Sequence, residues 1–211
     1  MRNSLLLGAA LGLLAITSQS NATLMVCQHP ACELQGTGIE NILLTDNQVG
    51  NPVTGVTNQT STLVDFTSTT DTLLTQGSGQ SEIRALDGII NEISFYAQDP
   101  GIGFSHVVFN VDAAADSLIQ ITAVDNFGTL FDFGSFTADG SGQNFFTIGS
   151  DDVQWARIVN IYGDGINVLT ELQQIRVDPD LIPDPVSVTA PGHVALLAMG
   201  LCGLVMARAR K

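Results

Sequence analysis

The chain has 211 residues, a formal net charge of −14 and 45% hydrophobic residues. All 21 acidic residues lie between residues 23 and 185, where only Arg84, Arg157 and Arg176 oppose them. The length allows one domain plus processing segments. So acidic a middle region argues against binding to nucleic acid or anionic lipid, and suits a secreted surface or a cation-binding face.

Residues 1–22 have the parts of a secretory signal peptide. Arg2 precedes an apolar run from Leu5 to Ile16, and the segment ends in small-x-small, Ser20-Asn21-Ala22. We therefore expect export, with cleavage between Ala22 and Thr23. An uncleaved anchor is the alternative, although so short an apolar run is brief for a bilayer span.

Two cysteines, Cys27 and Cys32, follow this cleavage site in the stretch CQHPAC. Outside the cytoplasm, two such close neighbours are expected to form a disulfide. A metal site is the alternative, but the pair and His29 fall short of the four ligands of a structural zinc site.

Residues 23–180 are expected to form one acidic domain of short β-strands. The strand-like segments are 89–97, 104–112, 118–125, 129–137, 144–149, 153–161 and 171–177. Several alternate apolar and polar residues; in 118–125, Ile119, Ile121 and Ala123 would share one face. Turn sequences separate the segments at intervals of about 8–14 residues, which predicts an all-β fold, an antiparallel β-sandwich or a jelly-roll-like body.

The expected core draws on the larger side chains of these strands: Phe95, Phe109, Phe131, Phe133, Phe146, Trp155 and Ile161. Trp155 is a ligand platform in the alternative interpretation. The stretch 54–81 is rich in Thr, Ser and Gln, which indicates edge strands with long loops or a surface for O-glycosylation.

Catalytic motifs are missing from the sequence. It has no G-x-S-x-G or H-E-x-x-H motif. Ser105 and His106 are adjacent in an expected strand, so their side chains would point to opposite faces, which argues against a catalytic triad. Carboxylate pairs for glycoside hydrolysis cannot be picked out among 21 acids.

Calcium is the one metal that the turns suggest, because it binds carboxylate and carbonyl oxygens gathered on loops. The candidate ligands are Asp139, Asp151, Asp152 and Asp164. Solvated turn acids are the alternative, and no other cofactor is expected.

The chain ends in an apolar run, Val194–Ala207, followed by Arg208, Arg210 and Lys211. As a helix this run is about 21 Å long, against roughly 30 Å of hydrocarbon, so it is a short transmembrane helix. Basic residues favour the cytoplasmic side, so residues 208–211 form a cytoplasmic tail and the body lies outside. A buried core helix is the alternative.

This tail resembles the PEP-CTERM sorting domain of Gram-negative bacteria over about 24 residues, keeping Val188, Pro191, the Leu/Gly-rich run and the basic end. It departs from the family at Thr189 and Ala190, where the family has Pro and Glu. Pro183-Asp184-Pro185 is similar to the missing motif but lies six residues earlier.

The resemblance implies that residues 181–193 form a Pro-rich junction that an exosortase-type membrane protease recognises. The precursor would be held in the inner membrane and then passed to the cell surface or the extracellular matrix.

The sequence thus predicts an exported, non-enzymatic surface or matrix protein that contacts polysaccharide, another polymer or protein. One alternative is an extracellular hydrolase that acts on polysaccharide through a carboxylate pair. Another is a binding protein held permanently by a single span.

Overall fold

The computed structural model describes residues 23–30, 38–45, 47–76, 81–149, 154–164 and 169–182. These residues contain 14 strands, and every strand pair among them is antiparallel. Within these ranges no helix has the length and apolarity needed to cross a membrane. The strands are β1 (Met25–Gln28), β2 (Glu40–Leu44), β3 (Val49–Gly50), β4 (Val53–Thr57), β5 (Leu63–Thr67), β6 (Leu73–Gln76), β7 (Glu82–Ala85), β8 (Glu92–Ala97), β9 (Ile102–Ala113), β10 (Ser117–Asp125), β11 (Leu130–Ala138), β12 (Asn144–Gly149), β13 (Ala156–Asp164) and β14 (Leu169–Leu181).

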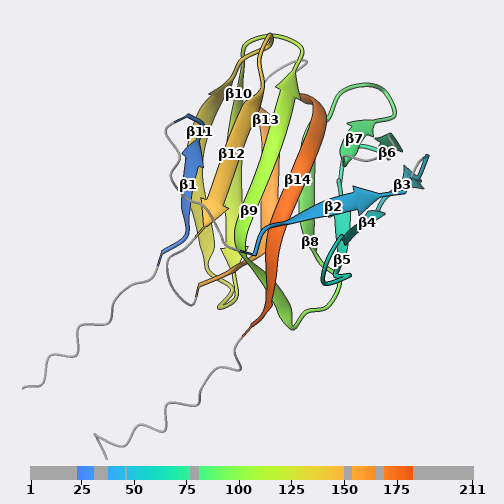
Figure 1. The fold of residues 1–211 in the computed structure, drawn as a ribbon. Coiled ribbons are helices and arrows are strands. Elements are labelled where there is room, and N and C mark those ends of the chain that lie inside the picture. The colour runs from blue at the N-terminus through green and yellow to red at the C-terminus, as the bar shows by residue number, and fades with distance from the viewer. Residues whose placement is uncertain are drawn as a thin grey trace, which may run out of the picture.

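The strands form two layers, which confirms the expected all-β antiparallel sandwich (Figure 1). One layer has the order β1-β12-β9-β14-β7-β6-β3, and the other has β11-β10-β13-β8-β5-β4. The layers are joined where β2 bonds both β4 and β14, and where Ala156 of β13 meets Phe104 of β9. The chain crosses between layers from β9 to β10, β11 to β12, β12 to β13 and β13 to β14, so most long strands neighbour partners distant in sequence.

The core lies between the layers and is built on phenylalanine. Phe66, Phe95, Phe109 and Phe146 are fully buried. The rings of Phe95 and Phe109 meet edge to face from opposite layers with centroids 6.2 Å apart, and Phe109 stacks on Phe146 at 5.6 Å. Such aromatic pairs stabilise a core beyond the area that they bury.

The strand alternation expected from sequence places the core correctly in most segments. Ile119, Ile121 and Ala123 are all fully buried on one face of β10, and Ile161 is buried on β13. In the Thr-rich stretch 54–81, expected to form edge strands with long loops or a surface for O-glycosylation, β5 is not an edge strand: it lies between β4 and β8, and its Val64 and Phe66 are fully buried. The O-glycosylation alternative stays a prediction.

Three of the expected core residues are less buried than predicted. Phe131 and Phe133 pack against the core but stay half-buried, because β11 is an edge strand bonded only to β10. Trp155 is half-buried because it precedes β13 at the end of the sandwich rather than lying within a strand.

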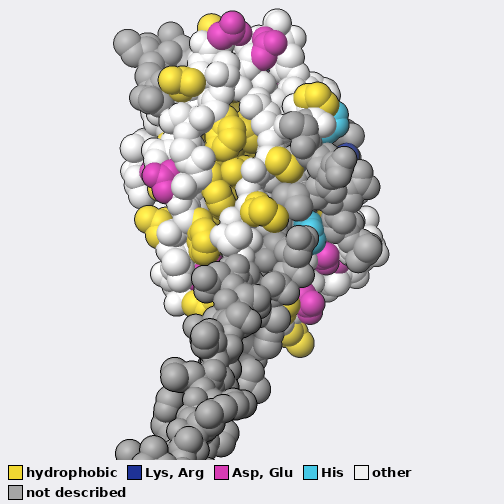
Figure 2. Space-filling model, turned by 90° about the vertical axis from the view of Figure 1, so that its left-hand side faces the viewer, with side chains coloured by type: hydrophobic (Ala, Val, Ile, Leu, Met, Phe, Trp, Pro, Cys, Tyr) yellow, Lys and Arg dark blue, Asp and Glu magenta, His cyan; other side chains and the backbone are white. Residues whose placement is uncertain are grey.

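The side of the sandwich between β1 and β11 is open (Figure 2). Both are edge strands, and the Gln28 side-chain amide of β1 reaches across to the Thr137 carbonyl of β11 at 2.8 Å. Half-buried hydrophobic side chains of β11 and β1 lie along this side: Val26, Phe131, Phe133 and Phe136. Figure 2 shows a stripe of hydrophobic surface on this side of the sandwich.

Candidate functional site

Both tyrosines of the chain lie on the outer face of the layer that contains β8 and β13. In β8, Ile93, Phe95 and Ala97 are buried and the alternate residues face outward, including Tyr96. In β13, Val159 and Ile161 are buried, and Tyr162 faces outward. We call this surface the tyrosine face, made of the outward side chains Thr54, Asp65, Ser94, Tyr96, Gln120, Thr122, Asp132, Asn160 and Tyr162.

The strand register fixes the distance between the two tyrosines. Tyr162 lies opposite Glu92 and Asn160 opposite Ser94, so Tyr96 falls beside Ile158. Four residues of β13 therefore separate the two phenol rings along the strands, which is about 13 Å. The phenol hydroxyls make no hydrogen bond to any other residue in the described ranges, so both are available to a ligand.

Between the tyrosines runs a line of hydrogen-bonded polar side chains. The Ser94 hydroxyl donates to the Asn160 side-chain oxygen at 2.8 Å, and the Asn160 amide nitrogen donates to the Thr122 hydroxyl at 3.0 Å. These bonds cross three neighbouring strands, β8, β13 and β10. They fix the rotamers of the polar groups before any ligand arrives, which lowers the entropy cost of binding.

An oriented carboxylate flanks this line on each side. Gln120 donates to both oxygens of Asp132 at 3.1 Å, and the backbone N–H of Gly134 donates to one of them at 2.9 Å. The Gly134 bond, followed by the Gln120 bond, lowers the pKa of Asp132. On the other side, Asp65 accepts from Thr54 at 2.6 Å and from Gln98 at 2.8 Å.

This arrangement suits a polyhydroxylated ligand. The half-buried rings of Tyr96 and Tyr162 offer an apolar surface with a polar rim, and fixed amides, hydroxyls and carboxylates offer both donors and acceptors. The carboxylates bind hydroxyl or ammonium donors and repel anionic groups. The tyrosine face therefore fits a neutral or amine-bearing glycan better than an acidic one.

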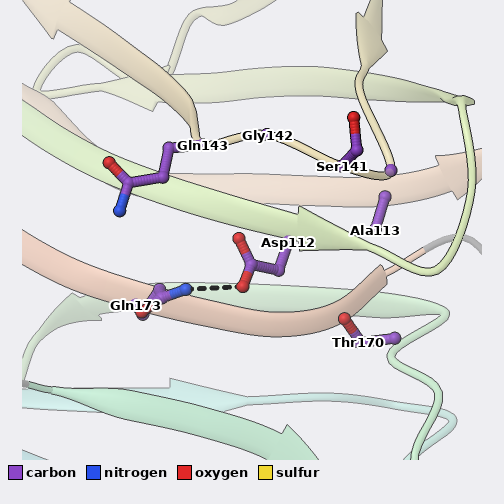
Figure 3. A pocket seen from close by; sticks show the side chains of 8 residues that line it. Asp112, Ala113, Ser141, Gly142, Gln143, Thr170 and Gln173 are labelled. Carbon is purple, nitrogen blue, oxygen red and sulfur yellow. Dashed lines mark hydrogen bonds between the residues drawn. The ribbon is translucent and has the colours of Figure 1, made fainter.

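A pocket of about 350 Å³ lies on the other layer, where the turn between β11 and β12 meets the end of β9 and the start of β14 (Figure 3). Its walls are polar, and the Gln173 side chain donates to the Asp112 carboxylate at 2.7 Å. The lining residues are Asp112, Ala113, Gly140, Ser141, Gly142, Gln143, Thr170 and Gln173. They include one carboxylate and no aromatic ring, so the pocket lacks the stacking surface of the tyrosine face.

Beside this pocket, Glu82 and Glu171 both pair with Arg84. Burial raises the pKa of Glu171, and the nearby Glu82 and Asp112 charges raise it further, while Arg84 opposes them. Glu171 lies opposite Asp112 in the register of β14 and β9. Glu171 and Asp112 are therefore a candidate for the carboxylate pair of a hydrolase, but Glu171 is held by Arg84 and does not line the pocket.

Ser105 and His106 do not point apart as expected. The Ser105 hydroxyl and His106 Nδ1 lie 3.3 Å apart. The reason is a register irregularity in β9, where Phe104 and His106 face the consecutive residues Pro179 and Asp178. No described carboxylate bonds the His106 ring, so the pair lacks the third group that orients a catalytic histidine.

The candidate metal ligands are not brought together. Asp139 accepts from the N–H and hydroxyl of Ser141, and these bonds lower its pKa. Asp164 ends β13, Asp151 and Asp152 lie outside the described residues, and no group of three or more metal-binding side chains occurs in the described part. The calcium site stays a prediction.

Cys27 is disulfide-bonded. Its expected partner Cys32 lies outside the described residues, so the pairing itself stays a prediction. Ala22 and the whole junction and tail lie outside them as well, including Pro183, Asp184, Pro185, Val188, Thr189, Ala190, Pro191, Arg208, Arg210 and Lys211.

Sequence reasoning missed the tyrosine face. The sequence did contain a signal for it, because each tyrosine stands at a position that alternates with the apolar core residues of its strand. The sequence does not reveal that β8 and β13 are neighbours, because more than fifty residues separate them.

No protein-family model and no curated protein matches this chain. Among solved structures it is similar to a mutant of a family 29 carbohydrate-binding module, with 10% identity, a TM-score of 0.35, and coverage of 77% of this chain and 99% of that one. It is also similar to a family 29 carbohydrate-binding module from Piromyces equi, with 16% identity, a TM-score of 0.26, and coverage of 74% and 90%. A third is the C-terminal domain of a chitobiase from Bacteroides fragilis, with 9% identity, a TM-score of 0.28, and coverage of 67% and 99%.

Proposed function

We propose that this protein is an exported, non-enzymatic protein that binds extracellular polysaccharide through the tyrosine face. The observation that carries the proposal is the placement of Tyr96 and Tyr162 on either side of the hydrogen-bonded line Ser94–Asn160–Thr122, which crosses the strands between them. An extended glycan laid across β8 and β13 would stack on both rings and bond the fixed polar groups between them. The face is long enough for an oligosaccharide rather than a single sugar.

Binding of soluble polysaccharides, measured by affinity electrophoresis and calorimetry, tests the proposal. Tyr96→Ala and Tyr162→Ala should each weaken binding by about tenfold, since a stacked aromatic contributes on the order of 1 kcal/mol beyond its buried area and 1.4 kcal/mol is tenfold. Tyr96→Phe should bind nearly as well, because the ring is kept. Leu86→Ala, at an exposed leucine outside the face, is the matched control.

The carboxylates of Asp65 and Asp132, which flank the hydrogen-bonded line of the tyrosine face, restrict the charge of the ligand. Neutral glucans or partly deacetylated amino-sugar polymers should bind, and uronic-acid polymers should not. Binding that is confined to anionic polymers, or that survives loss of both tyrosines, would overturn the proposal.

We also propose that the C-terminal segment is a sorting signal, so that an exosortase-type protease processes a precursor held in the inner membrane. Its support is the tail sequence. Among the described residues the last strand, β14, ends at Leu181, just before Pro183-Asp184-Pro185 in the sequence. Intact mass spectrometry of surface and membrane fractions tests it. A species that begins at Thr23 and lacks residues 194–211 is expected, whereas full-length tails found only in membranes would indicate a permanent anchor.

A hydrolase remains the second candidate, because the pKa of Glu171 is raised and Asp112 lies in the neighbouring pocket. Release of reducing ends from the polymers that bind would favour it. In that case Asp112→Asn should abolish release without weakening binding at the tyrosine face.

A further inference from the structure

One end of the sandwich gathers the turns that lie nearest to the exit of the chain toward its C-terminus (Figure 1). We call it the tail end. Strand register places there the start of β9, the β10–β11 turn, the start of β13 and the end of β14: Leu181 faces Ile102, and Ala156 faces both Phe104 and Asp125. The last described residue, Ile182, donates its N–H to the Gly101 carbonyl at 2.8 Å.

The tail end carries an unusual share of exposed apolar side chains. Phe127 is 62% exposed, Leu130 63% and Leu181 69%. In the described residues these are three of the four most exposed large hydrophobics, and the fourth, Leu86, follows β7 near the other end of the sandwich. The β10–β11 turn does not need exposed apolar side chains to form. Asp125 closes this turn by accepting from the N–H groups of Phe127 and Thr129.

The half-buried Trp155 connects these side chains. Its backbone pairs with Asn126 of the β10–β11 turn, with distances of 3.1 and 3.0 Å. Its Cβ also lies against Gly103, which in turn adjoins the side chain of Ile182. The backbone and Cβ of Trp155 therefore lie between the exposed turn and the end of β14. Tryptophan, phenylalanine and leucine are the side chains that partition into the interface of a bilayer.

Only residues 183–193 separate this end from the predicted span at Val194. Fully extended, they reach about 40 Å, so an anchored body cannot leave the neighbourhood of the bilayer. Tethering converts a weak lipid contact into an intramolecular one with a high effective concentration. Among the described residues at this end, the exposed acids Asp99 and Asp180 and the buried Asp125 outnumber the one base, the half-buried Arg157 that follows Ala156, and this excess of acid favours zwitterionic over anionic lipid.

We infer that the tail end docks on the bilayer that holds the precursor, with Phe127, Leu130 and Leu181 inserted in the interface of zwitterionic phospholipid. The inference rests on the membrane anchoring in the proposed function. It adds that the folded body, and not the tail alone, contacts lipid before processing.

Trp155 is the only tryptophan of the chain, so its fluorescence reports this contact. The full-length protein is reconstituted in phosphatidylcholine vesicles, with and without bromine on the lipid acyl chains near the headgroup. Brominated lipid should quench Trp155, and Phe127→Ser with Leu130→Ser should reduce the docking equilibrium constant by about tenfold for each side chain, which lowers the quenching. Leu86→Ser is the matched control, and adding anionic phosphatidylglycerol should weaken the quenching.

The outcomes separate the inference from the function on which it rests. If the protein floats with the vesicles and resists carbonate extraction but Trp155 is not quenched, the anchor stands and the docking is refuted. If the protein does not float, the anchor is refuted and the docking with it. Equal quenching in the double variant and the wild type would refute the insertion of Phe127 and Leu130 that the inference requires.

Discussion

Asp71 is a buried carboxylate whose removal should destabilise the layer that presents the tyrosine face. It is 8% exposed and precedes β6. One oxygen accepts from the Asn91 backbone N–H and the Thr70 hydroxyl, both at 2.8 Å, and the other accepts from the Asn91 side-chain amide at 2.8 Å. Asp71 thereby ties the β5–β6 connection to the residue before β8, the strand of Tyr96.

The change Asp71→Asn keeps the shape of the side chain but removes its charge. One amide oxygen can still accept from Asn91 N–H and Thr70, but the new NH₂ faces the Asn91 amide, donor against donor. A hydrogen bond to a charged group contributes about 1.5–3 kcal/mol, so losing one such bond and weakening the others should cost about 3 kcal/mol.

The cost should depend on pH in a defined direction. Burial by itself raises the pKa of Asp71, but the hydrogen bonds from Asn91 and Thr70 outweigh it, and the pKa is lowered. A lowered folded-state pKa means that the stabilisation is complete above the unfolded-chain pKa of about 3.9 and is lost as the pH falls through the folded-state pKa. The difference between wild type and variant should therefore be full at neutral pH and shrink below about pH 4.

Urea unfolding of the body, residues 23–182, followed by Trp155 fluorescence, measures this difference. Asp87→Asn is the control, because Asp87 is exposed and accepts one backbone bond, from Ile89 at 3.1 Å. A loss under 1 kcal/mol at neutral pH, or a loss that is the same at acid and neutral pH, would refute the reasoning.

Three other changes have defined outcomes. Phe109→Ala removes a fully buried ring that contacts Phe95 and Phe146, and should cost about 3–5 kcal/mol in urea unfolding. Glu40→Gln should destabilise mainly above the carboxyl pKa: burial opposes ionisation, but the Thr60 and Gln59 N–H bonds, each 2.8 Å, lower the pKa of Glu40, so its contribution fades as acid is added. Gly140→Ala should destabilise the pocket wall, because its Cβ would collide with the Ala115 backbone, and calorimetric melting should show the loss.

Much of the fold follows from local pattern. Period-two alternation located β8 to β14 and assigned Ile119, Ile121 and Ala123 to the core, because each strand has one wet face. It did not predict that Trp155 is half-buried, because this residue lies at the end of the sandwich and not within a strand. It also failed for Ser105 and His106, because a register irregularity is set by the partner strand and has no signature in the two residues themselves.

The candidate site was harder to foresee than the fold, because its residues come from strands that meet only through crossings between layers. Ser94, Thr122 and Asn160 are ordinary polar positions in three separate segments. Only the order β10-β13-β8 turns them into one hydrogen-bonded line. The sequence of each segment shows which residues of a strand face outward. It does not show which strands are neighbours in the sheet.

The two proposed contacts are compatible because they use perpendicular surfaces. The strands run from the tail end to the opposite end, and the tyrosine face lies along their length on one layer. If the tail end rests on the bilayer, the tyrosine face stands upright from it and stays open to a polymer that lies above the membrane. Removal of the tail would free the body from lipid without altering that face, so glycan affinity should be the same before and after processing. Binding that appears only after cleavage would mean that the membrane covers the tyrosine face, and that the body docks in a different orientation.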